Sequence, residues 1–312
     1  MSSSATTKPA LQQWHVTEPY VHPHCGLGEG PYYEAATNSV RFVDIKKQRV
    51  HAVSLDAGPG SLITIQLDTP VSVTADIAGI DPRDRILIGA KYGIAVLDRR
   101  AGTYEYVARF ASGVDNERLR GNDGAVDPHG RFWLGTMSDI GLHLQAEGHL
   151  YLFTGTRTAA QSMRHPVTIP NSVGWSPDNK TMYFTHSTER TVYAWDYALS
   201  DGGLSNERVF YRHEGPGEPD GFRVDVEGYM WHAVYGESRV LKISPAGALV
   251  GQVNLPTQNI TCVQFVGTEL FITTASMEKG EGPEEAVELS GALYRVDVGV
   301  RGLDPFEFKM DN

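Results

Sequence analysis

The sequence predicts an all-β fold, a six-bladed β-propeller with four-stranded antiparallel blades around a central channel. A turn containing Pro, Asp or Gly, followed by an alternating apolar strand around one bulky residue, recurs six times. The bulky residues are 40 to 50 residues apart, the repeat length of propeller blades. The 33 glycines and 10% aromatic residues in 312 agree, because short strands joined by turns need both. The bulky residues are Phe42, Leu87, Trp133, Tyr183, Trp231 and Phe271.

In chain order, the six copies read EAATNSVRFVDI, DPRDRILIGA, DPHGRFWLGT, SPDNKTMYFTHS, DVEGYMWHAV and VGTELFITTA. Most copies are followed by a second strand-like stretch, as in GIAVLD, GHLYLF, TVYAWDY, RVLKIS and ALYRVD. The same pair of strands in copy after copy favours the blades of a propeller. A β-sandwich with coincidental spacing is the alternative architecture.

Charge and composition exclude several classes of protein. The net charge is −11 and no Lys/Arg cluster occurs, which argues against nucleic-acid binding. No apolar run reaches the 18–20 residues of a membrane span. The N-terminus lacks the features of a secretory or transit peptide, and Cys25 and Cys262 allow no disulfide framework. We expect a cytoplasmic protein, monomeric or a small homo-oligomer, with residues 1–12 as a disordered tail and residues 13–312 as one propeller domain.

Four polar residues precede their blade's bulky residue by 11 to 13 positions, in phase with the repeat: Glu29, Asn122, Asn171 and Asp220. The inner strand of every blade lines the channel of a propeller, so we expect these four side chains to point towards one axis. Asp76 is also in phase, and we interpret it as structural.

Glu29, Asn171 and Asp220 offer only oxygen donors, the ligands that Ca²⁺, Mg²⁺ and Mn²⁺ prefer, although Zn²⁺ also accepts carboxylates. The alternative is that each residue caps a turn. Arg120 and Asn122 form a cation–amide pair that can hydrogen-bond a polyhydroxylated ligand or a carbonyl. For Arg120 the alternative is an ion pair with Glu117 or Asp123.

These residues lie in motifs that resemble a known family. GEGP contains Glu29, RGNDGAVDPHGRFWLGTM contains Arg120 and Asn122, NSVGWSPD contains Asn171, and PDGFRVDVEG contains Asp220. In this order and spacing they are similar to the senescence-marker-protein/gluconolactonase group, which comprises regucalcin and the sugar lactonases. The resemblance runs from about Trp14 to Gly302 and implies a six-bladed propeller.

The resemblance also implies an activity and a role for each residue. Glu29, Asn171 and Asp220 would hold one divalent metal ion, Ca²⁺ in first place, with Zn²⁺, Mn²⁺ or Mg²⁺ as alternatives. Arg120 and Asn122 would bind the substrate, and Asp220 would also be the catalytic base. The expected reaction opens a sugar lactone of the gluconolactone type to its hydroxy acid. The alternatives are a phosphotriesterase-like hydrolase and a non-catalytic calcium-binding propeller.

The sequence departs from the family pattern in two places. The family commonly has Asn-Gly where this chain has Asn171-Ser172, a change that keeps the ligand. Some members carry a substrate-contacting Glu shortly after Gly-Thr-Met, where this chain has Asp139 as a candidate replacement. Cys25 lies four residues before Glu29, and we interpret it as a small buried apolar residue.

Overall fold

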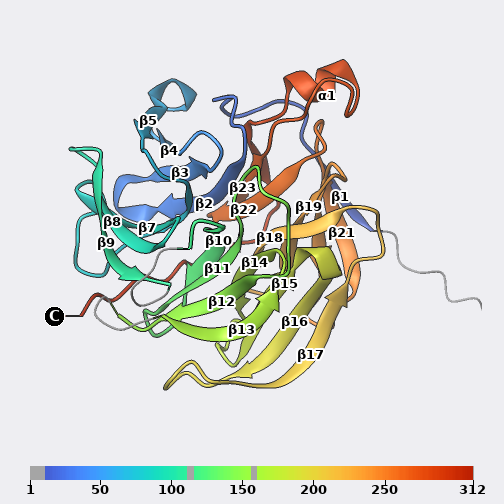
Figure 1. Cartoon of the computed structure of the whole chain (residues 1–312). Coiled ribbons are helices and arrows are strands. Elements are labelled where there is room, and N and C mark those ends of the chain that lie inside the picture. Colours follow the sequence, from blue (N-terminus) through green and yellow to red (C-terminus); the bar gives the residue numbers. More distant parts are fainter. Residues whose placement is uncertain (1–10, 111–115, 156–159, 312) are drawn as a thin grey trace, which may run out of the picture.

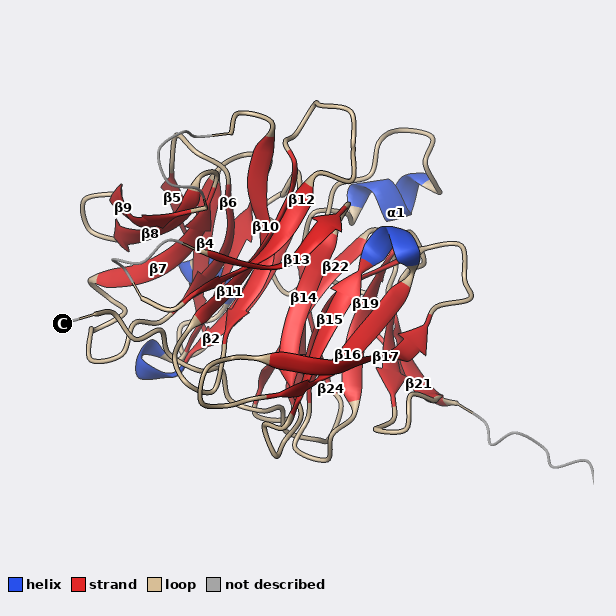
Figure 2. Cartoon of the chain, turned by 60° about the horizontal axis from the view of Figure 1, so that its bottom comes forward, coloured by secondary structure: helices blue, strands red, loops and turns tan. Residues whose placement is uncertain are grey.

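The structure, a computed structural model, describes residues 11–110, 116–155 and 160–311. These residues form six sheets in a ring, so the predicted six-bladed β-propeller is confirmed (Figure 1). Figure 2 shows that strands dominate the fold. Within the described ranges no helix is long and apolar enough to cross a membrane, and α1 (Glu284–Glu288) has five residues. Residues 1–10 of the expected tail lie outside the described part of the chain.

The first three blades each contain four antiparallel strands, which follow one another in chain order from the channel outwards. Blade 1 consists of β2 (Gly28–Glu34), β3 (Ser39–Asp44), β4 (Arg49–Ser54) and β5 (Ile63–Gln66). Blade 2 consists of β6 (Val71–Ala75), β7 (Arg85–Ala90), β8 (Gly93–Asp98) and β9 (Thr103–Arg109). Blade 3 consists of β10 (Leu119–Val126), β11 (Phe132–Ser138), β12 (Gly148–Phe153) and β13 (Gln161–Val167).

The other three blades begin in the same way, with an inner strand beside the channel. Blade 4 consists of β14 (Pro170–Trp175), β15 (Thr181–His186), β16 (Thr191–Tyr197) and β17 (Leu204–Arg212). Blade 5 consists of β18 (Glu218–Val224), β19 (Met230–Tyr235), β20 (Arg239–Ile243) and β21 (Leu249–Asn254). Blade 6 consists of β22 (Ile260–Val266), β23 (Glu269–Thr274) and β24 (Leu293–Asp297). Short 3₁₀ helices are η1 (Ala35–Thr37), η2 (Pro59–Ser61) and η3 (Ser187–Glu189).

The N-terminal segment completes the two last blades. β1 (Gln12–His15) pairs parallel to β21 and becomes the fifth strand of blade 5. Further along, Val21 bridges Leu293 of β24, and their backbone amides exchange hydrogen bonds of 3.2 and 2.9 Å. Residues from the start of the chain thus cover the outer edge of the three-stranded blade 6 and close the ring.

Hydrophobic clusters fill the interfaces between neighbouring blades. The six bulky residues of the sequence repeat all lie in the second strand of their blade, and all are buried. Trp231 of blade 5, for example, packs against Val263 and Ile272 of blade 6. Phe42 and Phe271 share the cluster that joins blade 1 to blade 6. The repeat in the sequence is therefore the repeat of this inter-blade core.

A shared turn explains the Asp-x-x-Gly-x-x-Trp spacing in blades 3 and 5. Asp127 accepts hydrogen bonds from two backbone amides of its own turn and, at 3.2 Å, from the indole Nε1 of Trp133. Asp225 does the same, with Trp231 Nε1 at 2.9 Å. Each carboxylate fixes the turn after the inner strand and holds the core tryptophan of the next strand. A buried indole N–H needs such an acceptor.

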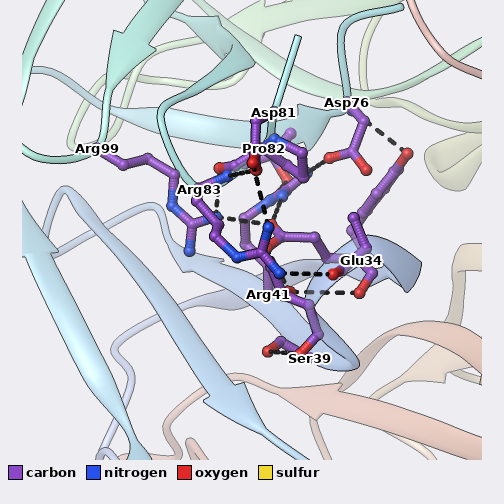
Figure 3. Close-up of polar contacts among 12 residues, drawn as sticks. Glu34, Ser39, Arg41, Asp76, Asp81, Pro82, Arg83 and Arg99 are labelled. Carbon is purple, nitrogen blue, oxygen red and sulfur yellow. Dashed lines mark hydrogen bonds and ion pairs between the residues drawn. The ribbon is translucent and has the colours of Figure 1, made fainter. Parts of the chain in front are cut away.

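A buried ion-pair network joins blades 1 and 2 (Figure 3). The Arg41 guanidinium is fully buried, pairs with Glu34, and donates to Asp76 at 2.9 Å and to the Thr74 hydroxyl at 2.8 Å. Arg99 donates to the same Glu34 carboxylate at 2.7 Å. The Asp76 carboxylate belongs to this network, in agreement with the interpretation of Asp76 as structural.

Replacing Arg41 should destabilise the propeller strongly. Arg41→Met leaves the Glu34 and Asp76 carboxylates without their shared cation, and breaking a buried pair in this way costs about 3–5 kcal/mol. Arg83→Met is the matched control, because Arg83 pairs with Asp81 at the surface, with side chains 59% and 46% exposed. That change should cost at most about 1 kcal/mol. Urea unfolding of both variants measures the difference, and equal free energies of unfolding would contradict the prediction.

Candidate active site

The four in-phase polar residues lie near the start of four inner strands. Glu29 is the second residue of β2, Asn122 the fourth of β10, Asn171 the second of β14 and Asp220 the third of β18. All four are buried, and the inner strands surround the axis side by side. The structure therefore brings these predicted residues together at one end of the channel.

The other end of the channel is covered by the C-terminal segment. Later residues of the same strands, including Tyr32, Val126 and Trp175, line a cavity of about 80 Å³ there. The C-terminal segment contributes Phe306 to its wall and is anchored by Phe308, whose N–H donates to the Asp76 carbonyl at 2.8 Å. The C-terminal segment thus covers the end of the channel opposite the four polar residues.

A β-bulge recurs at the same place in every inner strand. In each case the pairing with the second strand slips by one residue, so the inner strand holds one residue more than its partner. A bulge interrupts the alternation of side chains and redirects them. Its position is given by the flanking pairs Glu29/Tyr32, Val71/Val73, Gly121/Gly124, Pro170/Val173, Pro219/Phe222 and Ile260/Cys262.

Two glycines of the motifs are required by this geometry. Gly30 has φ of +52°, in the left-handed region. A Cβ on Gly221 would lie 2.3 Å from the Sγ of Cys262 on the neighbouring inner strand, so a side chain there would push blades 5 and 6 apart. The glycines after Glu29 and Asp220 therefore allow the chain to place those carboxylates.

Asp123 is a third carboxylate of the site that the sequence analysis did not select. It follows Asn122 directly, and the bulge in β10 turns both side chains inwards. Its carboxylate accepts a 2.5 Å hydrogen bond from the Ser172 hydroxyl, which in turn accepts the N–H of Phe222 at 2.9 Å. Asp123 thereby links the inner strands of blades 3, 4 and 5. Regular alternation along a strand would place Asp123 on the face opposite Asn122, so the sequence offered no signal for it.

Burial raises the pKa of all three carboxylates, and neighbouring carboxylates raise those of Glu29 and Asp220 further. Burial and the charge of Asp123 raise the pKa of Glu29 to about 8. Burial, followed by the charges of Glu29 and Asp123, raises the pKa of Asp220 well above its ordinary value. Burial likewise raises the pKa of Asp123. A site that concentrates negative charge away from water is electrostatically suited to a cation.

Within this group of residues, two buried oxygens have no hydrogen-bond partner in the described part of the chain, the Oδ1 atoms of Asn171 and Asp220. The amide of Asn171 is oriented, because its Nδ2 donates at 3.0 Å to Ser187 Oγ, which donates at 2.7 Å to the Pro219 carbonyl. His232 Nε2 lies 3.0 Å from the Asp220 carbonyl oxygen. Ser187 and His232 thus support the two residues, and neither was predicted.

The donor set fits a hard divalent cation. Glu29, Asn171 and Asp220 provide two carboxylates and one amide oxygen, and unpartnered buried oxygens are costly unless a ligand satisfies them. The Oε2 atom of Glu29 accepts the Gly30 N–H at 3.0 Å, which fixes this carboxylate in place. Turn capping, the alternative considered for these residues, leaves the two Oδ1 atoms unexplained.

Arg120 lies buried beside the acidic group. Its Nη1 donates to the Gly121 carbonyl at 2.8 Å and to Asn122 Oδ1 at 2.9 Å, while its Nε has no partner in the described part of the chain. None of the described ion pairs includes Arg120, and Glu117 pairs instead with Lys91. Burial lowers the pKa of Arg120 to about 10, so the guanidinium stays charged at neutral pH. A free, buried donor of this kind can bind an oxygen of a ligand.

Both the oxygen and the nitrogen of the Asn122 side-chain amide already form hydrogen bonds. Its Oδ1 accepts from Arg120, and its Nδ2 donates to the Pro170 carbonyl at 2.9 Å. In this arrangement Asn122 orients Arg120 towards the site. Asp139, the candidate replacement for the family's Glu, pairs with Lys91 Nζ at 2.6 Å.

A known protein family matches the part of the chain that contains these site residues. The family profile described as "SMP-30/Gluconolactonase/LRE-like region" matches residues 27–276, which include every motif described above. The chain belongs to this family. The resemblance noted in the sequence is thereby confirmed.

Named relatives of this SMP-30/gluconolactonase-like chain cover nearly its whole length. Pentonolactonase XacC of Haloferax volcanii is 34% identical over 92% of this chain and 96% of the relative. Human regucalcin is 32% identical over 91% and 95% of the two chains. Among solved structures, a luciferin-regenerating enzyme has a TM-score of 0.82 at 29% identity, covering 92% of this chain and 96% of the other. The chain therefore shares its propeller fold with that enzyme.

Without a bound cation, this family member should lose stability as the pH rises. The pKa of Glu29 is about 8 in the folded chain against 4.5 ordinarily, so between these values the folded state keeps a proton that the unfolded state has released. The free energy of unfolding therefore falls through this window, by up to about 1.4 kcal/mol per pH unit for one proton. Thermal unfolding in chelator at pH 5 to 8 measures this. Glu29→Gln should flatten the slope, and an unchanged slope would assign it to other groups.

Proposed function

We propose that this protein hydrolyses a sugar lactone of the aldonolactone type to its hydroxy acid in a reaction that depends on one divalent cation. The family and its relative named pentonolactonase support the reaction class. The observation that carries the proposal is the pair of buried, unpartnered oxygens on Asn171 and Asp220, found beside two further carboxylates among the described residues. They form a ligand set next to a free arginine donor.

Glu29, Asn171 and Asp220 would hold the cation. The oxygen donors favour Ca²⁺, with Mg²⁺, Mn²⁺ and Zn²⁺ as alternatives. When bound, the ion supplies positive charge that polarises the lactone carbonyl and stabilises the oxyanion that develops there. Asp123 adds negative charge to the group, and the Ser172 hydroxyl holds its carboxylate in place.

Arg120 would orient the substrate. Its Nε–H is free to donate to a ring hydroxyl or ring oxygen, while Asn122 and the Gly121 carbonyl keep the guanidinium plane fixed. A donor held in advance converts binding energy into orientation of the reacting carbonyl. Asn122 thus takes part in substrate binding through Arg120.

Asp220 would act as the general base. Its ionised carboxylate accepts a proton from the water that attacks the carbonyl carbon. The bond between that carbon and the ring oxygen then breaks, and the ring oxygen leaves as a hydroxyl after taking up a proton. The Asp220 backbone is held by His232, whose pKa burial lowers to about 3, so this imidazole is neutral and contributes no charge.

Paired assays test this function against its alternatives. Acid release is followed for a stereochemical panel of aldonolactones, and a phosphotriester is assayed beside them, each with Ca²⁺, Mg²⁺, Mn²⁺ or Zn²⁺. Turnover of at least one aldonolactone above the phosphotriester is the expected result. A preference for the phosphotriester favours the phosphotriesterase-like alternative, and saturable Ca²⁺ binding without turnover favours a calcium-binding propeller.

Arg120→Ala should raise KM strongly for hydroxylated lactones and much less for a plain lactone without ring hydroxyls. The loss of one charged hydrogen bond corresponds to about 1.5–3 kcal/mol, or roughly 10- to 150-fold in KM. Metal affinity is measured in parallel and should stay near the wild-type value. If both substrates are affected equally, Arg120 acts on the carbonyl or holds the loop.

A further inference from the structure

Blade 1 contains a second group of potential ligands, separate from the acidic site. The Sγ of Cys25, a carboxylate oxygen of Asp44 and a ring nitrogen of His51 all lie within 4.8 Å of one another. The three residues come from the segment before β2, the end of β3 and the middle of β4. Their exposures are 1%, 0% and 2%, so all three are nine-tenths buried or more. The lactonase mechanism uses none of them.

Asp44 is fixed in position by its backbone contacts. Its carboxylate accepts hydrogen bonds from the N–H groups of Gly26 at 2.8 Å, Leu27 at 3.1 Å and Lys47 at 3.1 Å. These bonds hold the segment that leads into β2 against the turn after β3. They also anchor Cys25 next to the carboxylate, because Cys25 immediately precedes Gly26.

His51 contributes a ring that has one unsatisfied nitrogen. Its Nδ1 lies 2.9 Å from Thr64 Oγ1, and its ring stacks on Phe42 with centroids 5.0 Å apart. Its Nε2 is buried and has no hydrogen-bond partner among the described residues. Burial lowers the pKa of His51 to about 4, so the imidazole is neutral at physiological pH. With the proton on Nδ1 donated to Thr64, Nε2 offers a lone pair.

The thiol of Cys25 is the third member. It is a free cysteine, and burial followed by the charge of Asp44 raises its pKa. The cations of Lys47 and Arg49 act in the opposite direction and favour the thiolate. The thiol also hydrogen-bonds to the Asp44 carboxylate, so it can exchange its proton for a metal ion, while Nε2 of His51 keeps an unused lone pair.

We propose that Cys25, Asp44 and His51 form a second metal site, which takes a thiophilic divalent cation such as Zn²⁺. Sulfur, imidazole nitrogen and carboxylate oxygen are the ligands of protein zinc sites, whereas Ca²⁺ and Mg²⁺ take oxygen ligands. Binding releases the thiol proton to solvent. The thiolate and the carboxylate then balance the charge of the ion, and Nε2 of His51 gains its missing partner.

Such a site would fasten the segment before β2 to the two middle strands of blade 1. Glu29 lies four residues after Cys25. The ion would therefore stabilise the chain segment that leads to Glu29 without contacting the acidic site. The proposal does not depend on the lactonase activity. Its test therefore needs no substrate.

Cobalt titration tests the proposal. Metal-depleted, reduced protein is titrated with Co²⁺, and the sulfur-to-cobalt charge-transfer absorption in the near ultraviolet is recorded. This band requires a Co–thiolate bond, which the all-oxygen site cannot form. The wild type should develop the band with one equivalent of Co²⁺, and Zn²⁺ but not excess Ca²⁺ should remove it. Native mass spectrometry counts the Zn²⁺ ions bound.

Four variants identify the ligands. Cys25→Ser should abolish the band, and His51→Gln should weaken Co²⁺ binding on the order of 100-fold or more, since even outer-shell changes reach 10- to 100-fold. Cys262→Ser is the matched control, because it removes the other buried free thiol, and it should keep the band. Asp220→Asn should keep it as well.

Three outcomes of the cobalt titration would contradict the proposed metal site. No charge-transfer band in the wild type, an unchanged band in Cys25→Ser, or loss of the band in Cys262→Ser would each overturn the proposal. Far-ultraviolet circular dichroism of the metal-free variants checks folding. If Cys25→Ser fails to fold, the wild-type band and the His51→Gln affinity decide the question.

Discussion

Asp220→Asn should lower kcat by about 10²–10⁴-fold when the assay is run at saturating cation, the usual contribution of a general base. Asparagine is nearly isosteric and keeps one oxygen for the metal, but it cannot accept a proton as a carboxylate does. Steady-state kinetics on the best aldonolactone measure the effect. Metal affinity is determined for the same preparation, because losing a negative ligand also weakens cation binding.

Glu29→Gln is the control for this variant. It removes the same charge from the same buried group of carboxylates, but it leaves the proposed base intact. If both variants regain comparable activity at high cation concentration, Asp220 is only a ligand. A bound cation favours the ionised form of Asp220, so its titration should form an acid-side limb of the wild-type pH–rate profile. The Asp220→Asn variant should lack that limb.

Chelation should abolish turnover while leaving the propeller folded. The hydrophobic clusters between blades and the Arg41 network do not include the acidic site, so the fold does not depend on its ion. Activity and far-ultraviolet circular dichroism are recorded before and after metal depletion. Ca²⁺, Mg²⁺, Mn²⁺ and Zn²⁺ should then restore activity to different degrees.

Full activity in thoroughly metal-depleted protein would contradict this mechanism. Zinc needs a separate control, because the proposed Cys25 site would also bind it. Comparing the wild type with Cys25→Ser separates the two effects: reactivation that requires the acidic site should persist in the variant. Glu29→Gln should instead require more cation for the same activity.

The propeller was predictable because its evidence is local and repeated. Each blade needs a turn, a strand with a bulky core residue, and a further strand, and this unit recurs along the chain. The structure places Trp133 and Trp231 at equivalent positions in the second strands of their blades, and Phe42 two residues away in blade 1, where all three fill inter-blade clusters. The same phase of the repeat located Glu29, Asn122, Asn171 and Asp220, because equivalent positions on inner strands face a common axis.

The strand pairing was less predictable than the period. The parallel addition of β1 to blade 5 and the contact of Val21 with Leu293 join residues from opposite ends of the chain. No local pattern in the first 27 residues specifies those partners. Closure of the ring brings the two ends of the chain together. It thereby determines that β1 pairs with the outer strand of blade 5 and that Val21 pairs with the outer strand of blade 6.

The finer parts of the site depended on contacts that a linear pattern does not contain. Alternation along a strand would place Asn122 and Asp123 on opposite faces, and only the bulge, a property of the pairing between β10 and β11, turns both inwards. Ser187 supports Asn171 across 16 residues, and its own acceptor, the Pro219 carbonyl, lies on the next blade.

The sequence by itself determined the blade period, the family and the four polar residues at the channel. All three are carried by short motifs whose spacing is the spacing of the blades. The tertiary structure alone decided that Asp123 joins the acidic group, that Asn122 orients Arg120, and that Cys25 meets Asp44 and His51. Those side chains meet because strand register and ring closure bring them together. Burial then makes their unpartnered polar atoms costly unless a ligand binds them.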